Sequence, residues 1–240
     1  MIIWILQTGE PLYSDNGNLR PMRAMNLSKA LIERGHKVEI ISTRFFHQKK
    51  IFRNTSNKVF FNGLLEETLI NSPGYSSNQS LTRLLDHFIL FFTLLNNLLK
   101  RKNKPDILFI GYPPIFWSLA AIIYGNIRGI PTLLDVKDFW PDIFWDKGNY
   151  SKVKKKLIKL VFTPYLISAT ISATFSHYIT GPTYLMANCF LEKYHNIILS
   201  TLFNIKKPKV FASPIVPPKE KEIKTKQKDS PKTLLKIFFI

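Results

Sequence analysis

The sequence is poor in cysteine, in acidic residues and in long uninterrupted apolar runs. Its single cysteine, Cys189, excludes an internal disulfide framework and is typical of a reducing compartment. We expect this lone cysteine to be a small buried side chain rather than a nucleophile. The apolar windows at 84–99 and 157–175 are interrupted by polar residues or proline, whereas a spanning helix needs about twenty clean apolar residues. We therefore expect no membrane-spanning helix, and the first residues lack the basic leader of a secretory signal.

Motifs of well-known chemistry are also missing. The sequence contains no Walker-type phosphate loop, no G-x-G-x-x-G, no G-x-S-x-G elbow and no Cys and His at metal-ligand spacing. The five histidines are scattered along the chain. We therefore predict no metal site and no resident cofactor.

Acidic residues are few relative to basic ones. The chain has 16 Asp and Glu against 34 Lys and Arg, which gives a formal net charge of +18. A field of this sign favours phosphates, whether they belong to nucleic acid, to anionic lipid or to a diphosphate substrate. Charge alone does not choose among these partners. With 45% hydrophobic and 13% aromatic residues, the chain also has enough apolar material for a sizeable core.

Strand patterns and helical patterns alternate along the chain. Buried strands are predicted at Met1–Gln7, Val38–Thr43, Glu66–Asn71, Asp106–Ile110 and Thr132–Val136, with shorter strands at His177–Thr180 and Lys209–Ala212. Helices are predicted at Arg20–Arg34, at Gln79–Leu99, between the fourth and fifth strands, at Lys152–Phe175, and from Thr183 to about His195. Strands that are apolar nearly throughout, joined by helices, are typical of a parallel sheet covered on both faces. The predicted fold class is therefore α/β, a Rossmann-like parallel sheet with helices on both faces.

The predicted domain organisation has three parts. Residues 1–213 form one Rossmann-like domain. Residues 214–232 are rich in Lys, Glu and Pro and cannot bury enough apolar surface to fold, so we expect a charged linker. Residues 233–240 have the pattern of a buried strand, and a strand needs neighbours. We therefore expect them to be the first strand of a second domain that this sequence does not include.

Polar and aromatic residues follow the strand Thr132–Val136. Ligands bind beyond the carboxyl ends of strands in open parallel sheets, and this end carries Lys137, Asp138 and Trp140. An aromatic ring stacks on the apolar face of a sugar while a carboxylate accepts its hydroxyl protons, and a positioned Asp138 also has the chemistry of a general base. The alternative is that Asp138 caps the next turn and Trp140 belongs to the core. Asp135, inside the strand, is predicted to be a structural partner.

A second polar cluster follows the first strand. Gly9 lies where that strand meets the first helix, and only glycine lets a phosphate or sugar approach the backbone closely there. The amino end of the helix adds positive potential. Arg20 and Arg23, which open the helix, would strengthen such an anion site and could clamp a diphosphate. The alternative is a simple turn glycine beside solvated arginines.

The segment Lys152–Lys159 combines five lysines with apolar residues at helical spacing. One interpretation is a solvated helix face. The other is a membrane-surface helix that attracts anionic lipid. Pro164, further along, is expected to kink or split the helix.

Six segments of the chain form a combination that is specific although each one alone is not. They are Met1–Gly9, Arg23–Val38, Pro105-Asp106-Ile107, Tyr112-Pro113-Pro114, Arg128-Gly129-Ile130-Pro131 and Leu134–Asp142. Together they resemble the amino-terminal domain of glycosyltransferase family 4 enzymes, and the resemblance covers roughly residues 1–213. Two motifs, Gly9-Glu10-Pro11-Leu12 and Asp135–Pro141, are most similar to members that build bacterial O-antigen or capsular polysaccharide.

The resemblance implies the amino-terminal half of a GT-B fold. In the family this half mainly holds the acceptor, the carboxyl-terminal half holds the nucleotide-sugar co-substrate, and transfer needs no obligatory metal. The implied function is transfer of a sugar to a polyprenyl-diphosphate-linked saccharide in surface polysaccharide biosynthesis, in the cytoplasm at the inner face of the plasma membrane. The family's glutamate pair that contacts the donor is not found in this sequence. The chain as given is therefore expected to be truncated before the donor-binding domain and inactive alone.

The resemblance also assigns roles to residues. Gly9 matches the family's glycine loop near the reacting phosphates, and Asp138 matches a loop position that many relatives fill with a polar residue, often histidine. Asp138 is thus the predicted catalytic residue. The predicted substrate-binding residues are Gly9, Glu10, Arg20, Arg23, Tyr112, Lys137 and Trp140.

A different class of function is compatible with the same composition. A basic, non-catalytic α/β protein would bind nucleic acid or an anionic membrane. Nucleic-acid binding would place Lys and Arg on one recognisable module with stacking aromatics, but here the cations are spread along the chain. We therefore expect no nucleic-acid partner, and keep an anionic membrane surface as a predicted partner.

Overall fold

The structure, a computed structural model, describes residues 1–17, 20–54, 58–78, 80–140, 142 and 151–212. The predicted linker at 214–232 and the predicted strand at 233–240 lie outside these residues. The strands are β1 (Ile2–Leu6), β2 (Lys37–Thr43), β3 (Phe45–Phe46), β4 (Ile51–Phe52), β5 (Lys58–Phe60), β6 (Leu65–Ile70), β7 (Ile107–Tyr112), β8 (Thr132–Val136), β9 (Tyr178–Gly181) and β10 (Lys209–Ala212). The helices are α1 (Arg23–Glu33), α2 (Leu81–Leu99), α3 (Ile115–Arg128), α5 (Lys152–Val161), α6 (Thr163–Phe175), α7 (Tyr184–Tyr194) and α8 (Ile197–Leu202), with a 3-10 turn, η1, at Phe61–Gly63.

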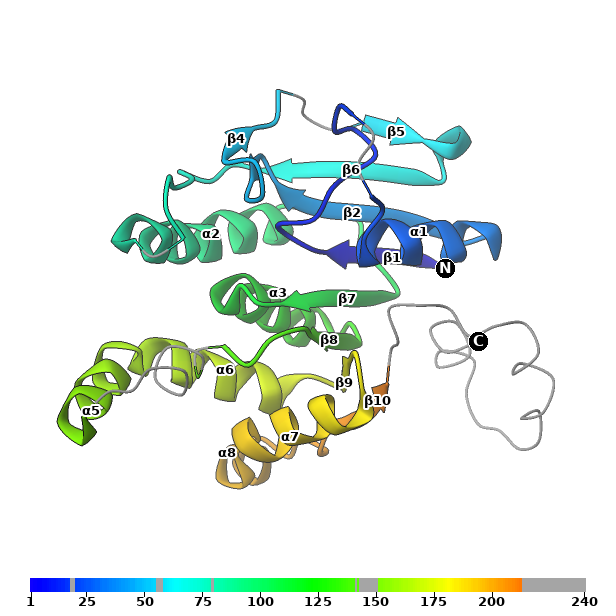
Figure 1. Ribbon diagram of the computed structural model, residues 1–240. Coiled ribbons are helices and arrows are strands. Elements are labelled where there is room, and N and C mark those ends of the chain that lie inside the picture. The colour runs from blue at the N-terminus through cyan, green and yellow to red at the C-terminus, as the bar shows by residue number, and fades with distance from the viewer. Residues whose placement is uncertain (18–19, 55–57, 79, 141, 143–150, 213–240) are drawn as a thin grey trace.

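Eight strands form one sheet in the order β10-β9-β8-β7-β1-β2-β6-β5 (Figure 1). Every neighbouring pair is parallel except β5 and β6 at the edge, which are antiparallel. From β6 to β9 the strands follow the doubly wound order of a Rossmann fold, and the direction of winding reverses between β1 and β7. The prediction of a Rossmann-like α/β sheet is confirmed.

The sheet is covered on both faces because successive side chains of its strands point to opposite sides. On one face, Trp4 and Leu6 of β1 pack in the larger core cluster with residues of α2, α3, α6 and α7. On the other face, Ile3 and Ile5 pack in a second cluster with Ala24 and Leu31 of α1. Helices α2, α3 and α6 lie next to one another on the first face (Figure 1).

Helix α1 ends as its sequence predicts. Gly35 adopts a left-handed φ of +78°, and its N–H donates to Ile32 O while the N–H of His36 donates to Leu31 O. These are the two hydrogen bonds of a Schellman cap. The helix begins later than the predicted Arg20, because Met22 is the N-cap residue; its side chain is 39% exposed.

Three local features differ from the sequence expectations. Phe45–Phe46 and Ile51–Phe52 form a small antiparallel hairpin where we expected irregular chain, because Phe45 pairs with Phe52 through backbone and ring contacts. Helix α8 was not predicted. Cys189 is exposed on α7, so the expectation of a buried thiol is wrong.

The basic helical segment is split near Pro164, as predicted. Helices α5 and α6 meet at an angle of 64° because proline occupies the first turn of α6. Within the described residues, no single helix has the length and apolar composition needed to cross a membrane, and the bent pair α5–α6 meets these two criteria only jointly.

Candidate functional site

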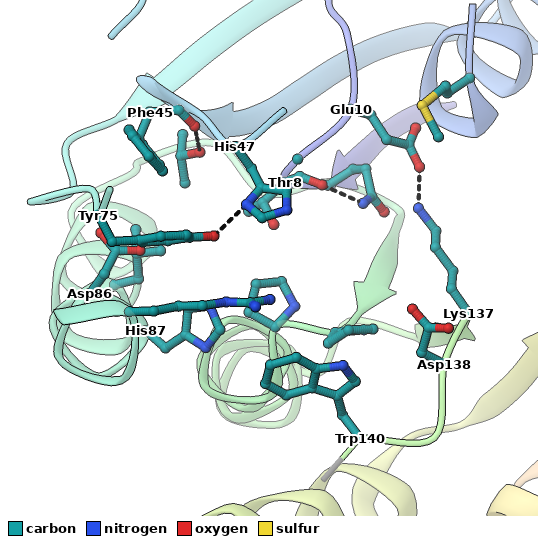
Figure 2. Close-up of a pocket in the computed structure, with 18 residues that line it drawn as sticks. Thr8, Glu10, Phe45, His47, Tyr75, Asp86, His87, Lys137, Asp138 and Trp140 are labelled. Atoms are coloured by element: carbon teal, nitrogen blue, oxygen red, sulfur yellow. Dashed lines mark hydrogen bonds and ion pairs between the residues drawn. The ribbon is translucent and has the colours of Figure 1, made fainter. Parts of the chain in front are cut away.

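A cavity of about 240 Å³ lies at the carboxyl ends of β1 and β7, at the reversal of the strand order (Figure 2). Open α/β sheets bind ligands at this point. The volume is slightly below the range of about 300–1,000 Å³ typical of small-molecule pockets, so it suits one small ring or polar head group. Its walls come from the loops after β1, β7 and β8, from the chain around β3, and from α2.

The structure brings together five of the eight predicted site residues. Gly9, Glu10, Lys137, Asp138 and Trp140 all line the cavity although they come from two distant segments of the chain. Their meeting follows from parallel strand topology, which places the ends of β1 and β8 on the same edge of the sheet.

The other three predicted residues lie elsewhere. Arg20 is exposed and does not line the cavity. Tyr112 is fully buried, so it makes no contact with a ligand; its hydroxyl donates to Trp140 O at 2.6 Å and supports the chain at the cavity wall. Arg23 is occupied by an internal ion pair with Asp135.

The glycine loop is built as predicted, but the expected phosphate site beside it is already neutralised. Gly9 has a left-handed φ of +74°, which favours glycine. The carboxylate of Glu10 accepts from the N–H of Ala24 at 2.8 Å, so it caps the amino end of α1, and it also pairs with Lys137. The positive end of this helix therefore carries a protein carboxylate, and the expectation that it receives an anionic substrate stays a prediction.

Arg23 and Asp135 complete this charge network. Nη1 of Arg23 lies 2.7 and 2.9 Å from the two carboxylate oxygens of Asp135, which is fully buried in β8. Burial raises the pKa of Asp135 to about 6, against the opposing charges of Arg23 and Lys137. The prediction that Asp135 is a structural partner is confirmed, and the expected diphosphate clamp at Arg23 is an internal ion pair in the structure.

Asp138 and Trp140 form the wall that follows β8. Asp138 is exposed at the cavity, while Trp140 is 8% exposed and its N–H donates to Asp138 O at 3.1 Å. The sequence left open whether Trp140 belongs to the core or to a binding site. In the structure it is largely buried and also lines the cavity. A carboxylate such as that of Asp138 can accept a hydrogen bond from a hydroxyl group.

The opposite wall was not predicted from the sequence and is centred on Arg83 of α2. Its guanidinium carbon lies 4.6 Å from the centre of the Trp140 ring and 5.5 Å from that of Tyr75, within the range of cation–π contacts. Nη1 of Arg83 donates to Asn78 O at 2.9 Å, and Nε is buried with no partner among the described residues. Arg83 is thus held between two rings at the edge of the cavity.

His47 faces the cavity as a hydrogen-bond donor. The hydroxyl of Tyr75 lies 2.5 Å from Nδ1 (Figure 2). The ammonium of Lys50 lies 3.0 Å from the same atom. An ammonium group can only donate, so Nδ1 is the acceptor and the proton of the neutral ring is on Nε2. Burial, assisted by the charges of Lys50 and Arg83, lowers the pKa of His47 to about 4. The ring is therefore neutral at pH 7.

Asp86 and His87 place two more titratable side chains beside Arg83. Asp86 accepts from the N–H of Gly74 at 2.8 Å, and burial raises its pKa. Burial lowers the pKa of His87 to about 3, and its Nδ1 has no partner among the described residues. The signal in the sequence was this adjacent polar pair inside an otherwise apolar helix, which we interpreted only as an interruption of a spanning segment.

The arrangement can bind a polar ring between donors and an acceptor. Arg83 and the Nε2–H of His47 lie on the α2 side, and the carboxylate of Asp138 lies on the β8 side. Among the described residues, no group of His, Cys, Asp and Glu has the geometry to hold a metal ion. The cavity therefore offers hydrogen bonding, aromatic contact and one candidate base.

Comparisons with known proteins show only a distant likeness. No protein-family model matches the sequence, and no curated protein matches it. Arabidopsis thaliana UGT89C1, solved in complex with quercetin, matches with a TM-score of 0.49 and 11% identity over 91% of this chain and 51% of that chain. A UDP-glucose: anthocyanidin 3-O-glucosyltransferase in complex with UDP matches with a TM-score of 0.44 and 9% identity over 90% and 53%. The chain spans about half the length of these structures, and likeness at this level does not identify its function.

Proposed function

We propose that this chain is the acceptor side of a glycosyltransferase that moves a sugar from a nucleotide-sugar to a lipid-linked saccharide. The observation that carries the proposal is the cavity at the strand reversal, where one exposed carboxylate, Asp138, stands beside the ring of Trp140. A sugar binds to such a site through its apolar face and its hydroxyl protons. The volume of about 240 Å³ suits one ring.

We assign Asp138 the role of general base in this reaction. Its carboxylate would take the proton from the acceptor hydroxyl while that oxygen forms the new bond to the anomeric carbon of the donor sugar. The bond from that carbon to the nucleotide diphosphate breaks, and the diphosphate leaves with its electron pair. The donors on the opposite wall, Arg83 and the Nε2–H of His47, would hold other oxygen atoms of the acceptor.

The positive charge of the chain supports an acceptor that carries a diphosphate. The net charge of +18 favours an anionic substrate. Within the cavity, Arg83 presents a guanidinium group, and Arg is well suited to phosphate oxygens. The surface polysaccharide pathway is the setting in which such an acceptor would occur.

A binding experiment tests the acceptor site without the donor. Titration calorimetry would compare a short polyprenyl diphosphate that carries one hexose with the same compound without the sugar. We expect the hexose to strengthen binding, and Asp138→Asn to weaken it by about 10- to 100-fold, because hydrogen bonds to charged groups contribute about 1.5–3 kcal/mol. Asp106→Asn is the matched control, since Asp106 is an exposed acid outside the cavity.

Equal binding of the two compounds, or an equal effect of the two substitutions, would overturn the proposal. A separate assay addresses transfer. Because the glutamate pair that contacts the donor in family 4 is not found in this sequence, we expect the chain to bind the acceptor without transferring sugar by itself. Transfer from a radiolabelled nucleotide-sugar by the purified chain would contradict that expectation.

A further inference from the structure

Helix α5 has an apolar face that nothing in the described chain covers. None of its residues is buried, and Val153, Leu157, Leu160 and Val161 are 57–71% exposed. Their spacing of four, three and one places them on one face of the helix. A face of four large apolar side chains left in water is unfavourable, at roughly 25 cal/mol per Å² of apolar area, unless a partner covers it.

Helix α2 has a second exposed apolar face with the same periodicity. It consists of Leu81, Leu85, Phe88, Ile89 and Phe92, of which Leu81 is 78% exposed and Phe92 is 54% exposed. Phe88 packs edge-on against Phe92 and against Phe116 of α3, so the ring is held in place although its outer side is bare. The opposite side of α2 carries the cavity residues Arg83, Asp86 and His87.

An apolar groove connects the two helices. A hollow of about 630 Å³ lies between α2, α3 and α6, and a second of about 350 Å³ lies between α5 and α6; both include Thr163. The first hollow is lined by Leu85 and Phe88 of α2 and by Ile167 of α6, which is 55% exposed. Helices α2, α5 and α6 lie along the same side of the molecule (Figure 1). The faces of α2 and α5 are therefore parts of one surface.

The charges beside this surface select its partner. By their helical spacing, Lys154 and Lys156 lie at the two edges of the apolar face of α5. Lys152 and Lys159 lie further round the helix, and Lys155 lies opposite the face. The only acidic residue in α2, α5 and α6 is Asp86, which is buried. A second copy docked through a two-fold axis would bring the same lysine-rich helix together with itself, which like charges oppose. An anionic bilayer offers both an apolar interior and negative head groups.

We propose that α2, α5 and α6 form a surface that docks onto an anionic lipid bilayer. The exposed apolar side chains of α5 and α2 enter the boundary between head groups and acyl chains, and the lysines of α5 contact anionic head groups, with their aliphatic stems lying along the apolar face. Docking in this way places the polar cavity one helix away from the head groups, since α2 separates the two. The inference does not depend on sugar transfer.

Vesicle co-sedimentation of the full chain tests this surface. Phosphatidylcholine vesicles with phosphatidylglycerol are compared with vesicles of phosphatidylcholine alone, and we expect strong, salt-sensitive binding to the first only. A triple variant, Lys152→Gln, Lys154→Gln and Lys156→Gln, should bind about 100-fold more weakly, because each lysine near the surface contributes about 1 kcal/mol. The control variant Lys206→Gln, Lys207→Gln and Lys209→Gln removes the same charge from exposed positions elsewhere and should bind as the parent does.

The apolar contribution needs its own pair of variants. Leu157→Gln with Leu160→Gln should weaken binding at least tenfold, since each buried leucine contributes about 1.5–3 kcal/mol. Ile197→Gln with Ile198→Gln on α8, where the side chains are 73% and 71% exposed, is the matched control. Because α5 buries no residue, the helical circular dichroism signal should stay unchanged in the α5 variants. Equal loss in test and control variants, equal binding to neutral vesicles, or a self-association that the α5 variants abolish would overturn the proposal.

Discussion

Nη1 of Arg23 on α1 lies within 2.9 Å of both carboxylate oxygens of Asp135 on β8, although 112 positions separate the two residues in the sequence. The pair joins the first helix to the strand that leads to Asp138. Asp135 is fully buried and the side chain of Arg23 is 10% exposed, so each charge depends on the other for compensation. This contact therefore links α1, which follows the loop of Gly9, to β8, which precedes Asp138.

Replacing Arg23 by Met should lower the free energy of unfolding by about 3–5 kcal/mol at pH 7.5, because it leaves a buried carboxylate without its partner. Burial already raises the pKa of Asp135 to about 6, and loss of Arg23 raises it further. The folded variant then holds a proton that the unfolded chain releases, so its deficit should shrink as the pH falls towards 5. Urea denaturation at the two pH values measures this.

Two variants complete that experiment. Arg34→Met removes an exposed arginine just after the same helix, so it should change the free energy of unfolding little at either pH. Arg23→Met combined with Asp135→Leu removes both charges and should recover most of the lost stability, since apolar replacement of a whole buried pair is often neutral or stabilising. A deficit that is the same at both pH values would argue against an unpaired carboxylate as its cause.

His87 should make the fold sensitive to acid. Burial lowers its pKa to about 3 from the ordinary 6.5, so between these values the unfolded chain binds a proton that the folded chain does not. Stability should therefore fall as the pH drops below 6.5, by up to about 1.4 kcal/mol per pH unit for this group. His87→Phe should remove that part of the slope in thermal or urea melts between pH 6.5 and 4.5.

The slope has to be compared with that of the parent protein, because Asp135 also contributes to it. The raised pKa of Asp135 makes stability increase as the pH falls over part of the same range, opposite to the effect of His87. His36→Phe on an exposed turn is the control, as its ring is little buried and its removal should leave most of the slope in place. The structure shows the imidazole of His87 excluded from solvent. If stability depends on pH equally in the parent and in His87→Phe, that burial is contradicted.

Tyr112 should act on the cavity without touching a ligand. Tyr112→Phe removes the hydroxyl that donates to Trp140 O at 2.6 Å, which should lower the free energy of unfolding by about 0.5–1.5 kcal/mol. The chain that carries Trp140 should become more mobile, visible as faster hydrogen exchange at that segment and as weaker acceptor binding. Tyr165→Phe is the matched control, because its buried hydroxyl has no hydrogen-bond partner among the described residues. A larger loss of stability in the control would contradict the assigned role of Tyr112.

The contact between α3 and β8 leaves no space for a methyl group. A Cβ at Gly125 would lie 2.4 Å from Cγ2 of Thr132, so Gly125→Ala should destabilise the fold by about 1–3 kcal/mol. Adding Thr132→Ser removes the clashing methyl but keeps the hydroxyl that lies 3.0 Å from Nδ1 of His177. The double variant should therefore recover part of the loss in urea melts, and no recovery would mean that another contact dominates.

Much of the fold was predictable because its signals are local. The strand β8 at Thr132–Val136 matches the predicted bounds, since a segment with four apolar or β-branched residues out of five lies between a proline break and a polar cluster. Gly35 predicted a helix end because few other residues adopt its positive φ. The hairpin of β3 and β4 could not be predicted in this way, since it depends on the pairing of Phe45 with Phe52 and carries no turn signal of its own.

The sequence by itself determined the order of strands and helices, the basic amphipathic character of α5, and the two loops that carry Gly9 and Asp138. Only the tertiary structure decided which charged side chains pair with one another inside the protein. Arg23 and Glu10 looked like substrate contacts because a sequence shows charges without their partners, and the sheet brings them against Asp135 and Lys137. In the same way, folding turned the polar pair in α2 and the distant His47 into one wall of the cavity. Contacts between residues far apart in the chain depend on packing, which local patterns do not encode.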